Sequence, residues 1–557
     1  MDTRQHANQP TVSSPALAPR SLISGSGLLL GFMFFAASLT PSLVPRDATF
    51  QGLLGGALFS VGYAIAVVVL RLWRWLELPE PNQERAHRAA ILAAVAGLGV
   101  LAYGLYRSTD WQNSIRALMG LELLESNHPL SVLALAAGTA FVIFLAAYLV
   151  RVVSRLVERP VARVVPPKLA VFTGLVAAFL LFGSLVNGVL VRSALTALDS
   201  FYAQLDQFMP PESQAPSDPM RTGSAQSLIS WDTMGRAGRQ FLDGIPTTGD
   251  LAAFWSDDVT EPRRIYLGLN AADDPQARAE LALQEMIRVG AFDRSIVVVA
   301  IPTGTGFMDQ PAIETLEYLH KGDVATVAMQ YSYLQSPFSL IFEPGYGSAT
   351  GRALLRTVYN YWTDLPEEGR SKLYLYGLSL GALASETSVR LHEVIGDPFD
   401  GALWAGPPFL GPMHQEVTRE RNPGSPEWLP VYEDGAFVRF MNQDEMTDAD
   451  APWGPMRIVY LQHGSDPIVF FSFDTFWWQP AWLRGERAPD VTQEMRWYPI
   501  VTGLQLATDM ALANDVPLGF GHQYAPRRYL DGWISLTSPD ASAADLDRLR
   551  ARFAGPR

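Results

Sequence analysis

The apolar and polar positions of the chain follow two different patterns, which change near residue 200. Before that point, five apolar stretches approach or reach the length of a membrane span, and none contains Asp, Glu, Lys or Arg. They are residues 22–39, 53–70, 89–106, 130–150 and 169–191. A span needs about 20 mostly apolar residues, within a range of about 17–25. The pattern therefore predicts an all-α transmembrane domain of about five helices.

Positive residues gather in alternate loops between these stretches. One set of loops, with the N-terminal tail, carries Arg4, Arg20, Arg71, Arg74, Arg85, Arg88, Arg151, Arg155, Arg159, Arg163 and Lys168. The other set carries Arg46, Arg107, Arg116 and Arg192. The positive-inside rule places the first set in the cytoplasm, so an odd number of spans puts the rest of the chain outside. The first stretch is also compatible with a signal sequence, which would leave the orientation of the other four unchanged.

After a Pro-, Ser- and Gln-rich linker at 209–221, apolar runs alternate with helix-like segments. The runs that predict strands are 264–269, 295–301, 324–331, 373–376, 401–405 and 457–461. The segments that predict helices are 277–289, 310–320, 350–362 and 382–394. Continuous apolar strands with helices between them indicate an α/β domain with a mostly parallel sheet covered on both faces.

The sequence Gly377-Leu378-Ser379-Leu380-Gly381 lies between one such strand and the helix after it. A serine at a sharp strand-to-helix turn needs small neighbours, and glycine has no Cβ to clash. In this context G-x-S-x-G predicts a nucleophile elbow, with Ser379 as the nucleophile. The alternative is an ordinary turn after a strand.

A serine hydroxyl needs a base, most often a histidine held by a carboxylate. His522 lies in the Gly-rich segment 519–524, late in the chain. Asp466 follows the strand at 457–461, which gives the order Ser, Asp, His. We therefore predict Ser379, Asp466 and His522 as a triad. Asp474 and Asp515 are the alternative acids, and His463 is set aside because it adjoins Asp466.

The oxyanion of acyl transfer needs backbone N–H donors that are already in place. The N–H of Leu380, directly after the nucleophile, is one candidate. Thr305 or Gly306, in the Gly-rich loop after the strand at 295–301, is the other. A phosphate-binding loop is the rival interpretation, but the segment lacks the Gly-Lys-Ser/Thr ending.

With these residues assembled, the second half of the chain resembles the α/β-hydrolase superfamily. The full layout, including Ser-Leu-Thr-Pro-Ser-Leu-Val-Pro-Arg at 38–46, is similar to a bacterial family of membrane-anchored α/β-hydrolases. The chain departs from many lipases in having Thr-Gly-Thr-Gly where they have His-Gly-Gly-Gly. The expected division is a cytoplasmic tail (1–20), a transmembrane domain (21–192), a connector (193–224) and a catalytic domain (225–557). The resemblance implies that residues 406–454 are a candidate cap insertion.

Composition narrows the function further. Charged residues are 18% of the chain and the net charge is −14, without a basic patch, so nucleic acid is not an expected partner. There is no cysteine, hence no disulfide and no thiolate metal ligand. Neither a cofactor nor a metal is expected. An aromatic cluster after Asp466 is expected to be core or a wall for an acyl chain or the bilayer: Phe470, Phe471, Phe473, Phe476, Trp477, Trp478 and Trp482.

The function expected from these features is an anchored serine hydrolase of the esterase or lipase type. Its substrate would be an ester of a lipid or another cell-envelope component, and its location the plasma membrane with the catalytic domain outside the cytoplasm. Acyl transfer by the same triad is the first alternative. A catalytically silent membrane scaffold is the second. No protein partner can be named from these residues.

Overall fold

The N-terminal region of the computed structural model is entirely helical. The structure describes residues 24–79, 82–184, 206, 214–256, 258–334 and 345–555. Its first helices are α1 (Gly25–Ser38), α2 (Ala48–Trp75), α3 (Gln83–Leu118), α4 (Pro129–Val161) and α5 (Pro167–Ser184). Helices α2, α3 and α4 are long and apolar enough to cross a membrane, whereas α1 and the apolar part of α5 are shorter. The predicted all-α region is confirmed. The tail (1–20) and most of the connector (193–224) lie outside the described residues.

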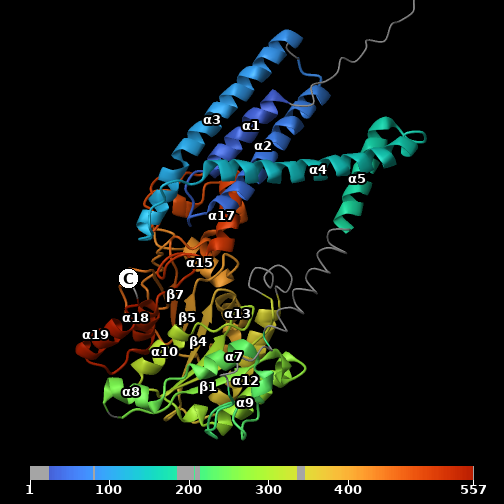
Figure 1. Ribbon diagram of the computed structural model, residues 1–557. Helices are drawn as coiled ribbons and strands as arrows, with labels where there is room; N and C mark the ends of the chain where they lie inside the picture. The colour runs from blue at the N-terminus through green and yellow to red at the C-terminus, as the bar shows by residue number, and fades with distance from the viewer. Residues whose placement is uncertain are drawn as a thin grey trace, which may run out of the picture.

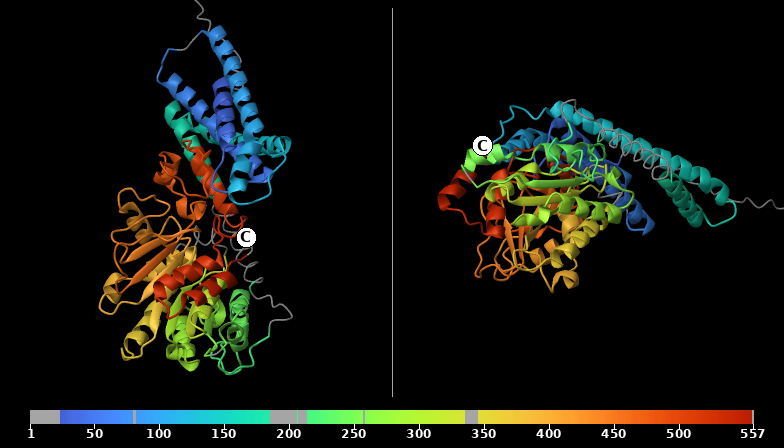
Figure 2. Two further views of the ribbon diagram at one scale, coloured as in Figure 1. Left: turned by 90° about the vertical axis from the view of Figure 1, so that its left-hand side faces the viewer. Right: turned by 90° about the horizontal axis from the view of Figure 1, so that it is seen from below.

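Small residues let these helices approach one another closely. A Cβ on Gly62 of α2 would lie 2.6 Å from the carbonyl oxygen of Leu30 in α1, and one on Gly56 would lie 2.4 Å from that of Ala136 in α4. Such close packing is typical of helices in membranes. Figures 1 and 2 show that α1, α2 and α3 form one bundle. Helix α4 runs across this bundle and pairs with α5.

The second region is built on a seven-stranded sheet of order β1-β3-β2-β4-β5-β7-β6, in which every pair is parallel. The strands are β1 (Arg263–Leu267), β2 (Ile296–Ile301), β3 (Val324–Met329), β4 (Lys372–Leu378), β5 (Gly401–Ala405), β6 (Val438–Met441) and β7 (Arg457–Leu461). All residues of β2, β3 and β5 are buried, as their unbroken apolar runs predict. The predicted parallel α/β sheet is confirmed.

Strand β6 is the one strand of this sheet that the sequence pattern did not predict. It lies within residues 406–454, the candidate cap, together with α15 (Pro412–Arg419). Because β6 pairs with β7 at the edge of the sheet, the end of that segment belongs to the sheet itself.

Helices cover the two faces of the sheet (Figures 1 and 2). Helices α9 (Pro275–Arg288), α12 (Tyr346–Thr363) and α13 (Leu380–Ser388) pack together as one layer, and α10 (Gln310–Leu319) packs with α18 (Pro526–Thr537) in another. The helix predicted at 382–394 ends early, because Val389 is extended, and α14 (Leu391–Val394) follows separately. The described part of the chain also forms the α-helices α7 (Gly235–Asp243), α8 (Thr248–Trp255), α16 (Pro467–Phe470), α17 (Val501–Leu512) and α19 (Ala543–Arg552).

Candidate active site

Ser379 occupies a strained turn between β4 and α13. Its φ of 55° and ψ of −125° are values that residues with a side chain rarely adopt. A Cβ on Gly377 would lie 2.4 Å from the carbonyl carbon of Gly381, and a Cβ on Gly381 would lie 2.1 Å from the carbonyl oxygen of Ile301. Two glycines are therefore a steric requirement of this turn. Leu380 is the first residue of α13, so its N–H is among those that the helix itself leaves free.

Asp466 and His522, which lie far apart in the sequence, are in direct contact. The Nδ1 atom of His522 lies 2.6 Å from Oδ2 of Asp466, and the Asp466 side chain is fully buried. The Tyr524 hydroxyl donates to the same Oδ2 at 2.7 Å, and the N–H of Ile468 donates to Oδ1 at 2.9 Å. These bonds hold the carboxylate in one orientation, and the carboxylate in turn orients the imidazole.

Ser379 and His522 each contact the carboxyl end of β5, at the neighbouring residues Ala405 and Gly406. The N–H of Ser379 donates to the carbonyl of Ala405 at 2.9 Å. A Cβ on the next residue, Gly406, would lie 2.5 Å from Cε1 of His522, so the ring rests directly against that glycine. The Nε2 atom of His522 is buried and has no hydrogen-bond partner among the described residues. This nitrogen is the one that a base acting on Ser379 would use.

A second buried histidine, His463, supports the loop that carries His522. Its Nδ1 bonds the carbonyl of Gly521 at 2.9 Å, and its ring stacks on that of Tyr524 at 4.3 Å between centroids. Burial lowers the pKa of His463, which favours a neutral ring that donates to this carbonyl. The alternative acids Asp474 and Asp515 are exposed. Among the described acids, Asp466 is the one bonded to His522.

The loop after β2 lies on the other side of the elbow, against Gly381. The N–H of Gly306 donates to the carbonyl of Thr303 at 2.9 Å, so this candidate oxyanion donor is already engaged within the loop. The N–H of Thr305 has no partner among the described residues, which leaves it as the candidate. Tyr266 holds the loop by donating to the carbonyl of Gly306 at 2.7 Å, and Gln330 donates to that of Thr305 at 3.3 Å.

Asp309, just after this loop, is a carboxyl group that the sequence did not single out. The Tyr529 hydroxyl donates to its Oδ2 at 2.6 Å. Burial raises the pKa of Asp309 to about 6, although the Tyr529 bond and the nearby His522 oppose the shift. Tyr524 was likewise missed. Its place two residues after His522 was a weak signal, whereas nothing in the sequence around Asp309 indicated a position near His522.

The aromatic cluster after Asp466 divides into two parts. Phe470, Phe471 and Trp482 are buried, as core residues would be. Phe473, Trp477 and Trp478 are 69%, 62% and 70% exposed. Phe409 joins the two parts, because its ring centroid lies 4.8 Å from that of Phe471 and 6.0 Å from that of Phe473. Phe409 therefore connects the buried ring of Phe471 to the exposed ring of Phe473. The exposed rings of Phe473, Trp477 and Trp478 are called the aromatic surface below.

The parallel sheet, the elbow after β4, and the acid and histidine that follow later strands define an α/β-hydrolase domain. A family model described as "Alpha/beta-hydrolase family" matches residues 263–549, and a second, described as "Alpha/beta-hydrolase family N-terminus", matches residues 39–246. The chain belongs to this family, and its helical N-terminal region is part of the family's layout. Comparison with curated proteins and with solved structures finds no match.

Proposed function

We propose that this protein is a membrane-anchored serine hydrolase that cleaves ester bonds through Ser379, His522 and Asp466. The observation that carries the proposal is the 2.6 Å contact between Asp466 and His522, together with the unpartnered Nε2 of a ring that rests against Gly406 at the end of β5. A carboxylate bonded to Nδ1 fixes the tautomer whose Nε2 accepts a proton, and it stabilises the imidazolium that forms.

The reaction follows from these positions. The Ser379 oxygen attacks the ester carbonyl, its proton passes to Nε2 of His522, and the carbonyl π electrons move to oxygen. The N–H groups of Leu380 and Thr305 are the proposed donors to that oxyanion. Collapse of the tetrahedral intermediate breaks the ester C–O bond, and the leaving alkoxide takes the proton from His522. Water then attacks the acyl-serine with His522 as base, which releases the acid and restores Ser379.

We further propose a lipid or another amphiphilic envelope ester as the substrate. The aromatic surface of Phe473, Trp477 and Trp478 supports this class, because exposed apolar patches mark ligand or membrane sites. Helices α2, α3 and α4 would keep the enzyme in the bilayer where such esters are found. The arginine distribution in their loops favours a catalytic domain on the extracytoplasmic side of the plasma membrane.

A fluorophosphonate probe and a p-nitrophenyl ester assay on the full-length protein test the activity. Wild type is expected to label and to hydrolyse, and Ser379→Ala to do neither. Ser388→Ala is the matched control, because it removes a hydroxyl from the same helix, where it bonds the carbonyl of Ser385. Equal labelling of wild type and Ser379→Ala would refute the proposal. An unlabelled wild type would favour a silent scaffold, and ester products with added alcohols would indicate acyl transfer.

The substrate class has its own test. A Trp477→Ala/Trp478→Ala variant is expected to lose activity on a diacyl ester in vesicles and to keep its activity on a short, soluble p-nitrophenyl ester. Ile287→Ala, which removes a similarly exposed side chain from α9, is the control. Equal losses on the two substrates would count against an amphiphile that enters along the aromatic surface.

A further inference from the structure

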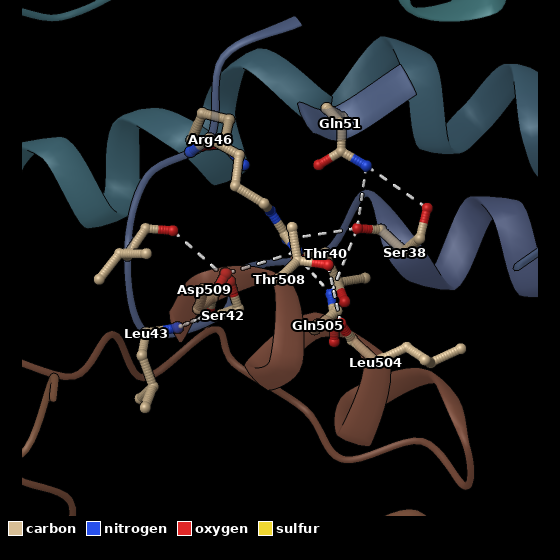
Figure 3. A network of polar contacts seen from close by, with 12 residues as sticks. Ser38, Thr40, Ser42, Leu43, Arg46, Gln51, Leu504, Gln505, Thr508 and Asp509 are labelled. Carbon is tan, nitrogen blue, oxygen red and sulfur yellow. Dashed lines mark hydrogen bonds and ion pairs between the residues drawn. The ribbon is translucent and has the colours of Figure 1, made fainter. Parts of the chain in front are cut away.

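The loop between α1 and α2 docks onto α17 of the hydrolase domain (Figure 3). Nη1 of Arg46 lies 3.7 Å from Oδ1 of Asp509, and both side chains are fully buried. The N–H of Leu43 donates to Oδ2 of Asp509 at 3.0 Å. Asp509 therefore forms an ion pair with Arg46 and accepts a hydrogen bond from Leu43 of the same loop. Asp509 and Leu43 are more than four hundred positions apart in the chain.

The same loop presents carbonyl groups to side chains from both regions. Nη2 of Arg46 donates to the carbonyls of Ser38 and Thr40 at 3.3 and 3.2 Å. Nε2 of Gln505, on α17, donates to these two carbonyls at 3.2 and 3.0 Å, and Gln51 of α2 donates to that of Ser38 at 3.2 Å. A network of hydrogen bonds thus joins the loop to α17 and fixes the position of one relative to the other.

The last turn of α17 also holds the loop that carries His522. The carbonyl of Ala513, directly after α17, accepts from the N–H of His522 at 2.8 Å. A buried cluster continues the contact: Val44, Ile115 of α3, Met119 and Leu512, with Val516 and Phe520 packed against it. Residues 509–513 therefore contact two loops at the same time: the α1–α2 loop and the loop that carries His522, called the histidine loop below.

We infer that the α1–α2 loop is a positioning element for His522, acting through the Arg46–Asp509 pair and the end of α17. This inference rests on the proposed function, because it assigns the N-terminal helices a part in completing the same site. Removing one charge of a buried pair leaves the other uncompensated, so the loop and α17 are expected to separate or shift. A small displacement of a catalytic base is enough to slow the chemistry without changing how substrate binds.

The test is Asp509→Asn in the full-length protein, which keeps the shape of the side chain and removes its charge. We expect kcat on a p-nitrophenyl ester to fall about 10- to 100-fold with KM nearly unchanged. We also expect faster hydrogen–deuterium exchange in the segment 513–524, which carries the His522 amide. Glu494→Gln is the control, because Glu494 lies 3.9 Å from Arg107 of α3, across the same interface, and is outside α17 and partly exposed. Its kcat and exchange are expected to match wild type.

Phe520→Ala is a second variant, which leaves the buried charges of Arg46 and Asp509 in place. It tests the inference if Asp509→Asn does not fold. It removes the ring that packs the histidine loop against the cluster of Val44, Ile115, Met119 and Leu512. The same loss of kcat and the same local exchange are expected. Folded variants with wild-type kcat and wild-type exchange would overturn the inference. A wild type that fails to label at Ser379 would instead refute the proposed function, while the exchange measurement would still report whether the α1–α2 loop holds residues 513–524.

Discussion

The two flanks of Ser379 are built in different ways. On the histidine flank, side chains make the contacts: His522, Asp466 and Tyr524 are buried and bonded to one another, and His463 supports their loop. On the opposite flank, the loop after β2 offers backbone N–H groups, and side chains only hold that loop from behind. In the proposed reaction, the first flank would move protons, which requires particular side chains. The second flank would stabilise charge, which the N–H of any residue except proline can do.

This difference predicts how strongly mutations on each flank should lower kcat. A substitution on the histidine flank removes a chemical group, whereas a substitution on the loop flank changes only how firmly a donor is held. Donors that are already in place stabilise an oxyanion because they need no rearrangement during the reaction. The groups of the histidine flank that would take part in proton transfer, Asp466 and His522, should therefore respond more strongly to mutation than side chains on either flank that only hold other groups in place. The following predictions test that expectation.

The largest effect is expected from Asp466→Asn. An amide in this place favours the wrong tautomer of His522 and cannot stabilise the imidazolium, so kcat should fall on the order of 10⁴-fold. Steady-state kinetics on a soluble p-nitrophenyl ester measures this directly. Asp474→Asn and Asp515→Asn alter the two exposed acids that the chain order also allowed, and they should keep wild-type kcat. A larger loss of kcat in either of these variants than in Asp466→Asn would mean that Asp466 is not the acid of the triad.

The same contrast explains what the sequence could predict. Ser379, Asp466 and His522 could be proposed from the sequence because elbow, strand-end and Gly-rich patterns mark side chains, and the structure places Asp466 and His522 in contact. Thr305 and Gly306 could not be separated, because the difference between them is a turn bond to the carbonyl of Thr303. A hydrogen bond between backbone groups of this kind cannot be predicted from the residue types.

The fold shows a similar limit. Six strands were predicted from continuous apolar runs, but β6 is four residues long and contains the half-buried Arg439, so its run is broken. It forms because β7 offers it a partner, which is a tertiary effect. The contact of Arg46 with Asp509 was equally hidden, because no local pattern links an arginine after α1 to an aspartate in α17.

On the loop flank, Tyr266→Phe should have an intermediate effect. It removes the hydroxyl that donates to the carbonyl of Gly306 at 2.7 Å, and the loop that carries Thr305 loses a restraint. Loss of a whole oxyanion donor costs about 10²–10³ in kcat, so a loosened donor should cost less, roughly 10-fold. Tyr374→Phe is the matched control, because that buried tyrosine bonds the carbonyl of Leu536, away from the loop. Equal kinetics for the two variants would exclude Thr305 as a donor held by Tyr266.

A smaller effect is expected from Tyr524→Phe on the histidine flank. Asp466 keeps its bonds to His522 and Ile468, so one of several restraints is lost. A single hydrogen bond is worth about 0.5–1.5 kcal/mol, which corresponds to roughly a 2- to 10-fold decrease in kcat. Tyr359→Phe, which removes a bond to the carbonyl of Asp397, is the control. A loss as large as that of Asp466→Asn would mean that Tyr524 acts in the chemistry itself.

The smallest effect on catalysis, and a clear one on stability, is expected from Asp309→Asn. Burial raises the pKa of Asp309 to about 6 in the folded protein, against about 3.9 when unfolded. The contribution of the protonated Asp309 carboxyl to the free energy of unfolding is therefore fully present below about pH 4. It is lost as the pH rises through about 6. The difference of about two pKa units sets a ceiling of about 3 kcal/mol.

The asparagine can still accept the bond from Tyr529 without carrying a charge, so its stability should not change with pH at this site. Melting temperatures measured from pH 8 down to pH 4.5 should show the variant above wild type at pH 8, with a gap that narrows as the pH falls. Asp474→Asn, at an exposed position, should show no such gap. A gap of constant size across this range would mean that the carboxyl of Asp309 is already ionised in the folded protein, and the loop flank would then carry a negative charge beside His522 throughout catalysis.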